Sequence, residues 1–275
     1  RLASSQHSDD VVIPAARGTI YDRGGVQLAI GVEGQTVYAD PRRVTDPKGE
    51  AETVARILRL DPDQVYRKLT DRTHGFVYVA RKADPALAAK LARKGLPGIG
   101  FYPEERRFYP QFNLASQVLG YAGIDNHGLA GLELSLDRKV AGQPGRERIV
   151  KDASGQAIDT VVSRVERDGE DVYLTLDHTI QANAQAVLRD TVSRWHAKSA
   201  TAIVLDPATG AVRAMAVAPG FDANRYPEIW RALQRNRAVT DTYEPGSTFK
   251  LVTVAGALSD RLVSPSTRFT LPYEI

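Results

Sequence analysis

The sequence predicts an α+β fold that is divided into more than one domain. At 275 residues the chain is long for a single domain. Hydrophobic residues make up 43% of it and charged residues 25%, which is typical of a globular protein with packed cores. Strand-like runs, helical runs and a hairpin follow one another, which indicates an antiparallel sheet packed on helices.

The first half of the chain predicts short strands and helices in alternation. Residues 1–10 are polar and predict a loosely structured N-terminal stretch. Apolar residues recur at helical spacing over 50–69 and from Asp84-Pro85 to Gly95, where we expect helices. Short β-branched and aromatic runs predict strands at 11–13, 20–21, 26–30, 36–39, 76–80 and 99–102.

The composition changes near Gly169, and we expect two domains, 1–168 and 169–275. Residues 146–170 are charged and strand-like, and predict an extended connector between the domains.

Beyond this change, Asp177 can cap a helix whose apolar residues continue to Trp195. Strands at 201–205 and 211–218 flank an Asp206-Pro207 turn and predict a hairpin.

Composition excludes several classes of function. The net charge of +3 comes from interspersed residues without a run of like charge, so we expect no nucleic-acid partner. The chain has no cysteine, and its five histidines lack metal-binding spacing, so we expect no metal site. No nucleotide-binding glycine motif follows a strand, and we expect no cofactor. No apolar run reaches the roughly 18 residues of a membrane span.

The strongest chemical signal is Ser247, with Lys250 three positions later. On a helix these two residues share a face, and Pro245-Gly246 breaks the chain just before it. A lysine desolvated by apolar neighbours can act as the base that activates a serine nucleophile. Alternatively, Ser247 is a plain helix N-cap and Lys250 is solvated. A lysine in the first helical turn opposes the helix dipole, which weighs against this alternative.

Two charged clusters in the first half have a simpler interpretation. Arg17, Asp22 and Arg23 can form a solvated ion-pair cluster of little energetic value. The run from Glu104 to Arg107 likewise predicts a solvated face.

A series of different short motifs follows in order along nearly the whole chain. Those of the first half are Arg17-Gly18-x-x-x-Asp22-Arg23-x-Gly25, Arg107-Phe108-Tyr109-Pro110 with Leu119-Gly120, and Gly128-x-x-Gly131-Leu132-Glu133 with Leu136-Asp137. Those of the second half are Leu174-Thr175-Leu176-Asp177, Asp206-Pro207-x-Thr209-Gly210 and Glu244-Pro245-Gly246-Ser247-Thr248-Phe249-Lys250. This series resembles the class B penicillin-binding proteins, the monofunctional transpeptidases of bacterial cell-wall synthesis, and above all their cell-division branch.

The resemblance implies an N-terminal pedestal of small mixed subdomains, followed by the start of a serine-transpeptidase domain of the penicillin-binding and β-lactamase-like type. It implies that Ser247 is the nucleophile and Lys250 the general base of a peptidoglycan D,D-transpeptidase that β-lactams acylate. It also implies that the charged and glycine positions of the first half hold the pedestal together and do not take part in catalysis. These positions are Arg17, Gly18, Asp22, Arg23, Arg107, Gly131 and Glu133.

One departure from the family pattern is large. The family also carries a Ser-x-Asn motif and a Lys-Thr/Ser-Gly strand, and neither occurs in positions 248–275. We therefore expect a truncated transpeptidase domain, and expect these 275 residues alone to react poorly with a fluorescent penicillin.

The resemblance also implies partners and a location. The expected partners are peptidoglycan stem peptides, β-lactams, and membrane proteins of the division or elongation machinery. The expected location is the outer face of the bacterial cytoplasmic membrane, with an N-terminal anchor helix that this chain lacks. Two alternatives stay open: a partner-binding scaffold with an inert transpeptidase half, and a serine β-lactamase or penicillin-sensing protein.

Overall fold

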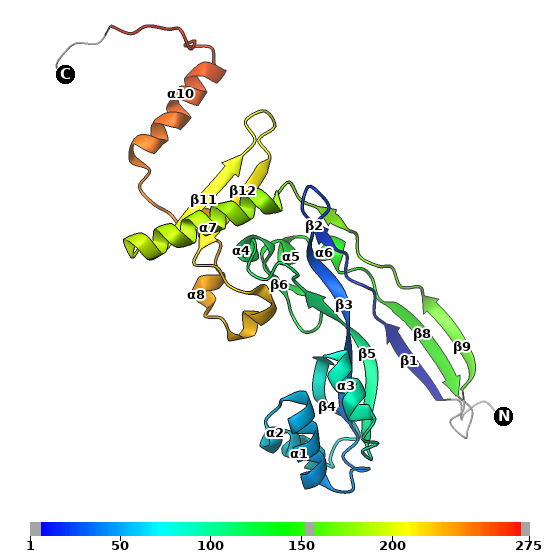
Figure 1. Cartoon of the computed structure of the whole chain (residues 1–275). Helices are drawn as coiled ribbons and strands as arrows, with labels where there is room; N and C mark the ends of the chain where they lie inside the picture. Colours follow the sequence, from blue (N-terminus) through cyan, green and yellow to red (C-terminus); the bar gives the residue numbers. More distant parts are fainter. Residues whose placement is uncertain (1–6, 152–156, 271–275) are drawn as a thin grey trace. The chain divides into compact units, whose positions relative to one another are not determined.

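The computed structural model describes residues 7–151 and 157–270, and the α+β prediction is confirmed (Figure 1). Two compact units divide the chain, Arg1–Ala238 and Val239–Ile275. The residues on both sides of the predicted 168/169 boundary belong to the first unit.

A long central strand organises the first sheet. This strand, β3 (Gln27–Ala39), pairs antiparallel with β5 (Ile99–Phe108) without interruption from Ile30↔Phe108 to Ala39↔Ile99. It also pairs antiparallel with β2 (Ile20–Tyr21) and β4 (Val77–Ala83). The short β10 (Val172–Tyr173) joins β2 in parallel, so residues beyond 169 extend a sheet that begins in the first forty residues.

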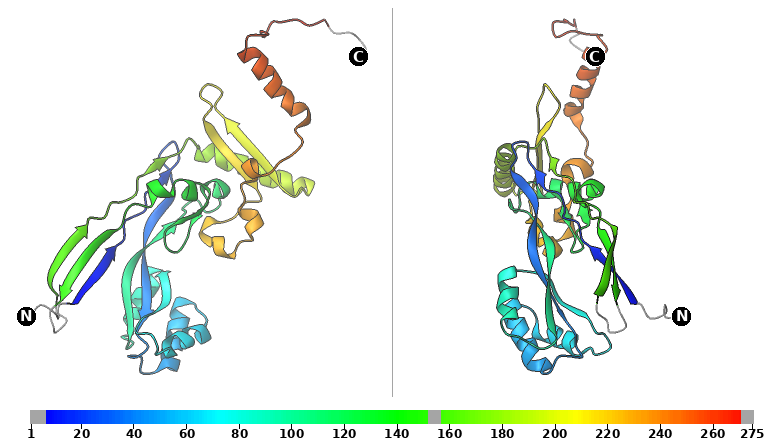
Figure 2. Two further views of the ribbon diagram at one scale, coloured as in Figure 1. Left: turned by 180° about the vertical axis from the view of Figure 1, so that it is seen from behind. Right: turned by 90° about the vertical axis from the view of Figure 1, so that its right-hand side faces the viewer.

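Three helices cover one face of strands β3–β5 (Figures 1 and 2). They are α1 (Pro47–Leu58), α2 (Pro62–Thr70) and α3 (Pro85–Ala92). Each begins with proline after an aspartate whose carboxylate accepts backbone N–H bonds, the N-cap arrangement that the Asp-Pro pairs favour. Buried aliphatic residues such as Val37, Val54 and Leu91 join these helices to the sheet.

A second, three-stranded sheet corrects two predictions. Its strands are β1 (His7–Ile13), β8 (Gly145–Lys151) and β9 (Ala157–Arg164), all antiparallel. The loose N-terminal stretch expected over 1–10 is wrong from His7 onward. The strand-like character expected over 146–170 is confirmed for β8 and β9, but these strands form a sheet and not an extended connector. Backbone hydrogen bonds make the sheet ladders, so polar and charged residues can pair here without an apolar pattern.

Several short elements surround the second hydrophobic core. They are α4 (Ser116–Leu119), β6 (Tyr121–Ala122), β7 (Gly128–Ala130), α5 (Gly131–Ser135) and α6 (Asp137–Val140). This core contains Ile20, Leu28 and Tyr109 from the first half and Leu176 and Phe221 from the second. The two halves of the first unit therefore share one core.

The predicted helix and hairpin beyond Asp177 are confirmed. Helix α7 (His178–Trp195) packs on the hairpin of β11 (Ala200–Leu205) and β12 (Val212–Ala218) through Leu188 and alanines of β12 (Figure 2). Short helical segments η1 (Ala223–Glu228), α8 (Arg231–Gln234) and α9 (Arg237–Thr240) follow.

The second unit contains one short and one longer helical segment, η2 (Gly246–Phe249) and α10 (Lys250–Ser259). Within the described part of the chain, no helix has both the length and the apolar content that crossing a membrane requires. The same residues include no group of three or more histidine or carboxylate side chains that could hold a metal ion.

Candidate functional site

Ser247 and Lys250 lie one turn apart in the second unit. The backbone N–H of Lys250 donates to the carbonyls of Ser247 and Thr248, which closes a 3-10 turn. Side chains three positions apart eclipse each other in such a turn, so those of Ser247 and Lys250 leave the segment on the same side.

The start of this segment is fixed by Pro245 and Gly246. The backbone N–H of Thr248 donates to the carbonyl of Pro245 at 3.1 Å, and the Thr248 hydroxyl bonds the same oxygen. The N-cap position is Pro245, and no side chain caps it. The alternative interpretation of Ser247 as a plain N-cap is therefore wrong, because Ser247 lies inside the helical segment.

The burial expected around Lys250 is not supplied by the second unit. Both Ser247 and Lys250 are exposed, and so are the neighbouring apolar side chains of Leu251, Val252 and Val254. Within the described residues 239–270, the segment therefore sets the order and spacing of the two side chains but does not supply the desolvation of the amine.

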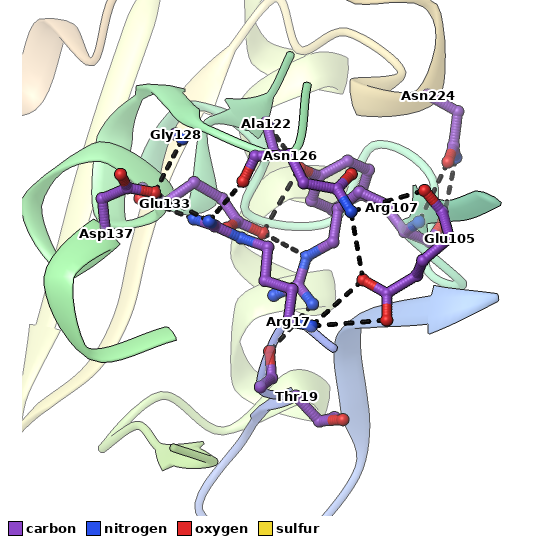
Figure 3. A network of polar contacts seen from close by, with 12 residues as sticks. Arg17, Thr19, Glu105, Arg107, Ala122, Asn126, Gly128, Glu133, Asp137 and Asn224 are labelled. Atoms are coloured by element: carbon purple, nitrogen blue, oxygen red, sulfur yellow. Dashed lines mark hydrogen bonds and ion pairs between the residues drawn. The ribbon is translucent and has the colours of Figure 1, made fainter. Parts of the chain in front are cut away.

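In the first unit, Arg17 is buried at the centre of a polar network (Figure 3). Its Nε and Nη2 atoms lie 2.8 and 2.7 Å from Oε2 of Glu133, and Nη1 lies 2.7 Å from Oδ1 of Asp137. The carbonyls of Asn126 and Glu133 accept two further hydrogen bonds. Burial alone would lower the pKa of Arg17, but Glu133 and Asp137 outweigh it and the pKa is raised.

The second oxygen of the Glu133 carboxylate pairs with another arginine. Arg107 places Nε 2.7 Å from Oε1 of Glu133 and donates from Nη1 to the carbonyl of Gly18 at 2.8 Å. The hydroxyl of Tyr109 donates to the same carboxylate oxygen at 3.3 Å. Each oxygen of this fully buried carboxylate therefore faces one arginine, which offsets the cost of burying the charges.

Two predicted pedestal glycines allow the backbone around this network to pack closely. A Cβ at Gly18 would lie 2.1 Å from the carbonyl oxygen of Glu170. Gly131 has φ +57°, and a Cβ there would lie 2.5 Å from the carbonyl oxygen of Val118. No other residue type fits either position without movement of the backbone.

Asp22 and Arg23 lie outside this network. The buried Asp22 carboxylate accepts the backbone N–H groups of Gly24, Val26 and His178, and lies 2.7 Å from Nδ1 of His178. Burial alone would raise the pKa of Asp22, but these hydrogen bonds outweigh it and the pKa is lowered. Arg23 is exposed and only approaches Asp177, at 3.5 Å.

The solvated interpretations of these clusters are therefore wrong for most members. Arg17, Asp22 and Arg107 are buried, whereas Arg23 and Arg106 are exposed and fit the expectation. Glu105 is half-buried, and its carboxylate accepts the backbone N–H of Arg17. A strand places alternate residues on opposite faces, so a charged run on a strand cannot be solvated as a whole when one face is covered.

Sequence reasoning gave no role to Tyr109, Asp137, Asn126, His178 or Asn224. Tyr109 and Asp137 lie inside the motifs quoted above, and this position could have indicated a structural role for them. Nothing in the local sequence marks the other three, because the contacts with Arg17, Asp22 and Tyr109 that give them a role join positions 109 to 156 apart.

Two family models match the chain. The penicillin-binding protein dimerisation domain matches residues 12–174, and the penicillin-binding protein transpeptidase domain matches residues 200–273.

Curated proteins of known name are similar over most of the chain. The probable peptidoglycan D,D-transpeptidase PenA of Neisseria meningitidis is 35% identical over 269 residues, which are 96% of this chain and 46% of PenA. The peptidoglycan D,D-transpeptidase FtsI of Escherichia coli is 33% identical, with coverage of 96% and 46%. The stage V sporulation protein D of Bacillus subtilis is 32% identical, with coverage of 96% and 42%. The chain thus spans less than half the length of these relatives.

Two solved structures share the fold. A peptidoglycan synthetase from Bifidobacterium adolescentis matches with a TM-score of 0.64 and 25% identity, covering 97% of this chain and 53% of that one. Penicillin-binding protein 2X from Streptococcus thermophilus matches with a TM-score of 0.60 and 21% identity, covering 94% and 43%.

Proposed function

The chain belongs to the penicillin-binding proteins that carry a dimerisation domain before a transpeptidase domain, and on this premise we propose that it is part of a peptidoglycan D,D-transpeptidase. The relatives named as D,D-transpeptidases support the reaction class. The observation that carries the assignment to residues is the single 3-10 turn that joins Ser247 to Lys250.

The proposed reaction is acyl transfer through Ser247. Lys250 takes the hydroxyl proton while the oxygen attacks the carbonyl carbon of the penultimate D-alanine of a stem peptide. The terminal D-alanine leaves with a proton on its amine, and the remaining peptide is held as an ester of Ser247. The amine of a neighbouring stem then attacks this ester and loses a proton, which passes through Lys250 to the Ser247 oxygen as the cross-link forms.

Two features would stabilise charge during these steps. The backbone N–H of Ser247 can donate to the oxyanion that forms on the attacked carbonyl. The first turns of a helical segment also present the positive end of the helix dipole to that oxygen. A β-lactam would enter by the same attack and leave Ser247 acylated.

The test uses the full-length protein, because this chain covers only 46% of the relatives PenA and FtsI. A fluorescent penicillin should label it at Ser247, located by peptide mass mapping, and Ser247→Ala should abolish the label. Ser259→Ala, at an exposed serine that ends the following helix α10, is the matched control and should label normally. Labelling at another residue, or labelling that survives Ser247→Ala, would overturn the assignment.

Lys250 is tested separately from Ser247. Lys250→Arg keeps a positive charge but cannot act as a base, because arginine stays protonated. We expect the acylation rate to fall by about 100-fold or more, which is the usual contribution of a positioned general base. Unchanged acylation in this variant would show that another group takes the proton. Rapid turnover of the antibiotic by the wild type would instead favour the β-lactamase alternative.

We further propose that the protein works at the outer face of the cytoplasmic membrane, with membrane proteins of the division or elongation machinery as partners. Both follow from the proposed substrate, which lies outside the cytoplasm. Protease accessibility in spheroplasts tests the location, and co-purification from membranes tests the partners.

A further inference from the structure

The segment between β12 and the second unit is held on a loop of the first half of the chain. The backbone N–H of Ala223 donates to the carbonyl of Phe112 at 3.2 Å. The rings of Tyr121 and Tyr226 stack with centroids 4.1 Å apart, and the Tyr121 hydroxyl donates to Gln234. We call residues 219–234 the lead-in segment, because the chain runs from them to Ser247.

Asn224 makes the most specific of these contacts. Its Oδ1 accepts the backbone N–H of Tyr109 at 2.9 Å, and its Nδ2 donates to the carbonyl of Tyr109 at 3.0 Å. Asp222 orients the amide by accepting a second hydrogen bond from Nδ2 at 3.0 Å. A planar group that both donates and accepts is needed for this pairing, which only an amide side chain provides.

Tyr109 connects Asn224 to the buried network. Its hydroxyl accepts the backbone N–H of Ala122 at 2.8 Å and donates to Oε1 of Glu133. Tyr109 is almost fully buried, in the core that also contains Phe221 and Ala223 of the lead-in segment. Figure 3 shows Asn224 at the edge of the network that Arg17, Arg107 and Glu133 form. One buried residue therefore contacts both the network and the lead-in segment.

We propose that Asn224 is a positioning residue for acylation of Ser247, acting by fixing the lead-in segment to Tyr109. The proposal rests on the function proposed above. The segment that carries the nucleophile continues from a backbone held at Asn224, and displacement of a reacting group by about 1 Å costs about 100-fold in rate. Release of this contact leaves the nucleophile present but less accurately placed.

Gln185 offers a matched control. Gln185 lies on helix α7, and its amide also hydrogen-bonds the backbone of the first half of the chain. It donates to the carbonyl of Asn113 at 3.0 Å and accepts the N–H of Ala115 at 2.9 Å. Gln185→Ala therefore removes the same kind of contact to the same loop, and neither of these two hydrogen bonds involves the lead-in segment.

The experiment compares Asn224→Ala, Asn224→Asp and Gln185→Ala in the full-length protein. For both Asn224 variants we expect a limiting acylation rate about 10- to 100-fold below wild type, with little change in the half-saturating penicillin concentration. Complete labelling of Ser247 at long times shows that the nucleophile is intact. A carboxylate in place of the amide cannot donate to the carbonyl of Tyr109, so Asn224→Asp should behave like Asn224→Ala. Gln185→Ala should lower the melting temperature to a similar extent and acylate at the wild-type rate.

Two outcomes would overturn the proposal. One is acylation of Asn224→Ala within twofold of wild type, and the other is equal slowing in Gln185→Ala, which would assign the effect to general destabilisation. Hydrogen exchange over residues 225–238 gives a readout independent of the chemistry, and it should be faster in Asn224→Ala than in Gln185→Ala. If wild type is not labelled at all, the proposed function fails and the positioning role fails with it, while exchange still decides whether Asn224 fixes the segment.

Discussion

Arg17 and Glu133 form a fully buried ion pair although 116 positions separate them in the sequence. Two guanidinium nitrogens of Arg17 lie within 2.8 Å of one carboxylate oxygen, and neither side chain is exposed. The removal of one partner of such a pair leaves a charge buried without compensation, which costs far more than the net value of the pair. The pedestal should therefore depend strongly on each member of this network.

Arg17→Ala should destabilise the first unit by about 3–5 kcal/mol, because Glu133 then keeps only Arg107 as a cationic partner. For a unit of this size the melting temperature should fall by on the order of 10 °C. Thermal unfolding followed by circular dichroism measures this. Arg23→Ala, a half-exposed arginine of the same motif, should melt within a few degrees of wild type. Equal melting of Arg17→Ala and wild type would remove the structural role of the network.

Glu133→Gln should be at least as damaging as Arg17→Ala. The amide leaves the guanidinium groups of Arg17 and Arg107 buried without their shared anion. The urea concentration at half-unfolding should fall markedly, whereas Glu52→Gln on the exposed face of α1 should leave it unchanged. A small effect of Glu133→Gln would mean that water or a neighbouring group compensates both arginines.

The sequence predicted the local elements well and the buried network poorly. Asp46, Asp61 and Asp84 cap helices through N–H groups two or three positions away, so local pattern is enough to find them. Arg17 instead finds its partners 88 to 120 positions away, and no local pattern separates it from the exposed Arg23. The motif resemblance marked both arginines as structural, and only the fold shows which one is buried. Similarly, the pairing of β1 with β8 depends on backbone groups that the sequence does not distinguish.

Asp22→Asn should lower stability at neutral pH and flatten its dependence on acid. The pKa of Asp22 is lowered in the folded chain, so its carboxylate stabilises the fold above its unfolded pKa of about 4. This contribution is lost as the pH falls through the lower folded pKa. The difference in unfolding midpoint between wild type and Asp22→Asn should therefore be largest near pH 7 and shrink below about pH 4.

Unfolding midpoints from pH 7 down to pH 2.5 measure this difference, at intervals of about half a pH unit. Other carboxylates titrate in both proteins and cancel in the comparison. A difference that stays constant with pH would show that Asp22 acts through shape and neutral hydrogen bonds alone.

Gly131→Ala and Gly210→Ala separate two costs that glycine substitutions usually combine. Both glycines have positive φ, +57° and +72°, so alanine pays a similar backbone strain of about 1–2 kcal/mol at each. At Gly210 a Cβ would meet nothing within 4 Å, whereas at Gly131 it would lie within 2.7 Å of backbone atoms of Val118, Leu119 and Gly120. Backbone atoms cannot rotate away as a side chain can, so α4 or α5 must move in Gly131→Ala.

We expect Gly131→Ala to melt well below Gly210→Ala, and to expose the neighbouring Glu133 network to faster hydrogen exchange. Equal melting of the two variants would mean that the α4–α5 contact yields at little cost, and that Gly131 is required for its backbone angle alone.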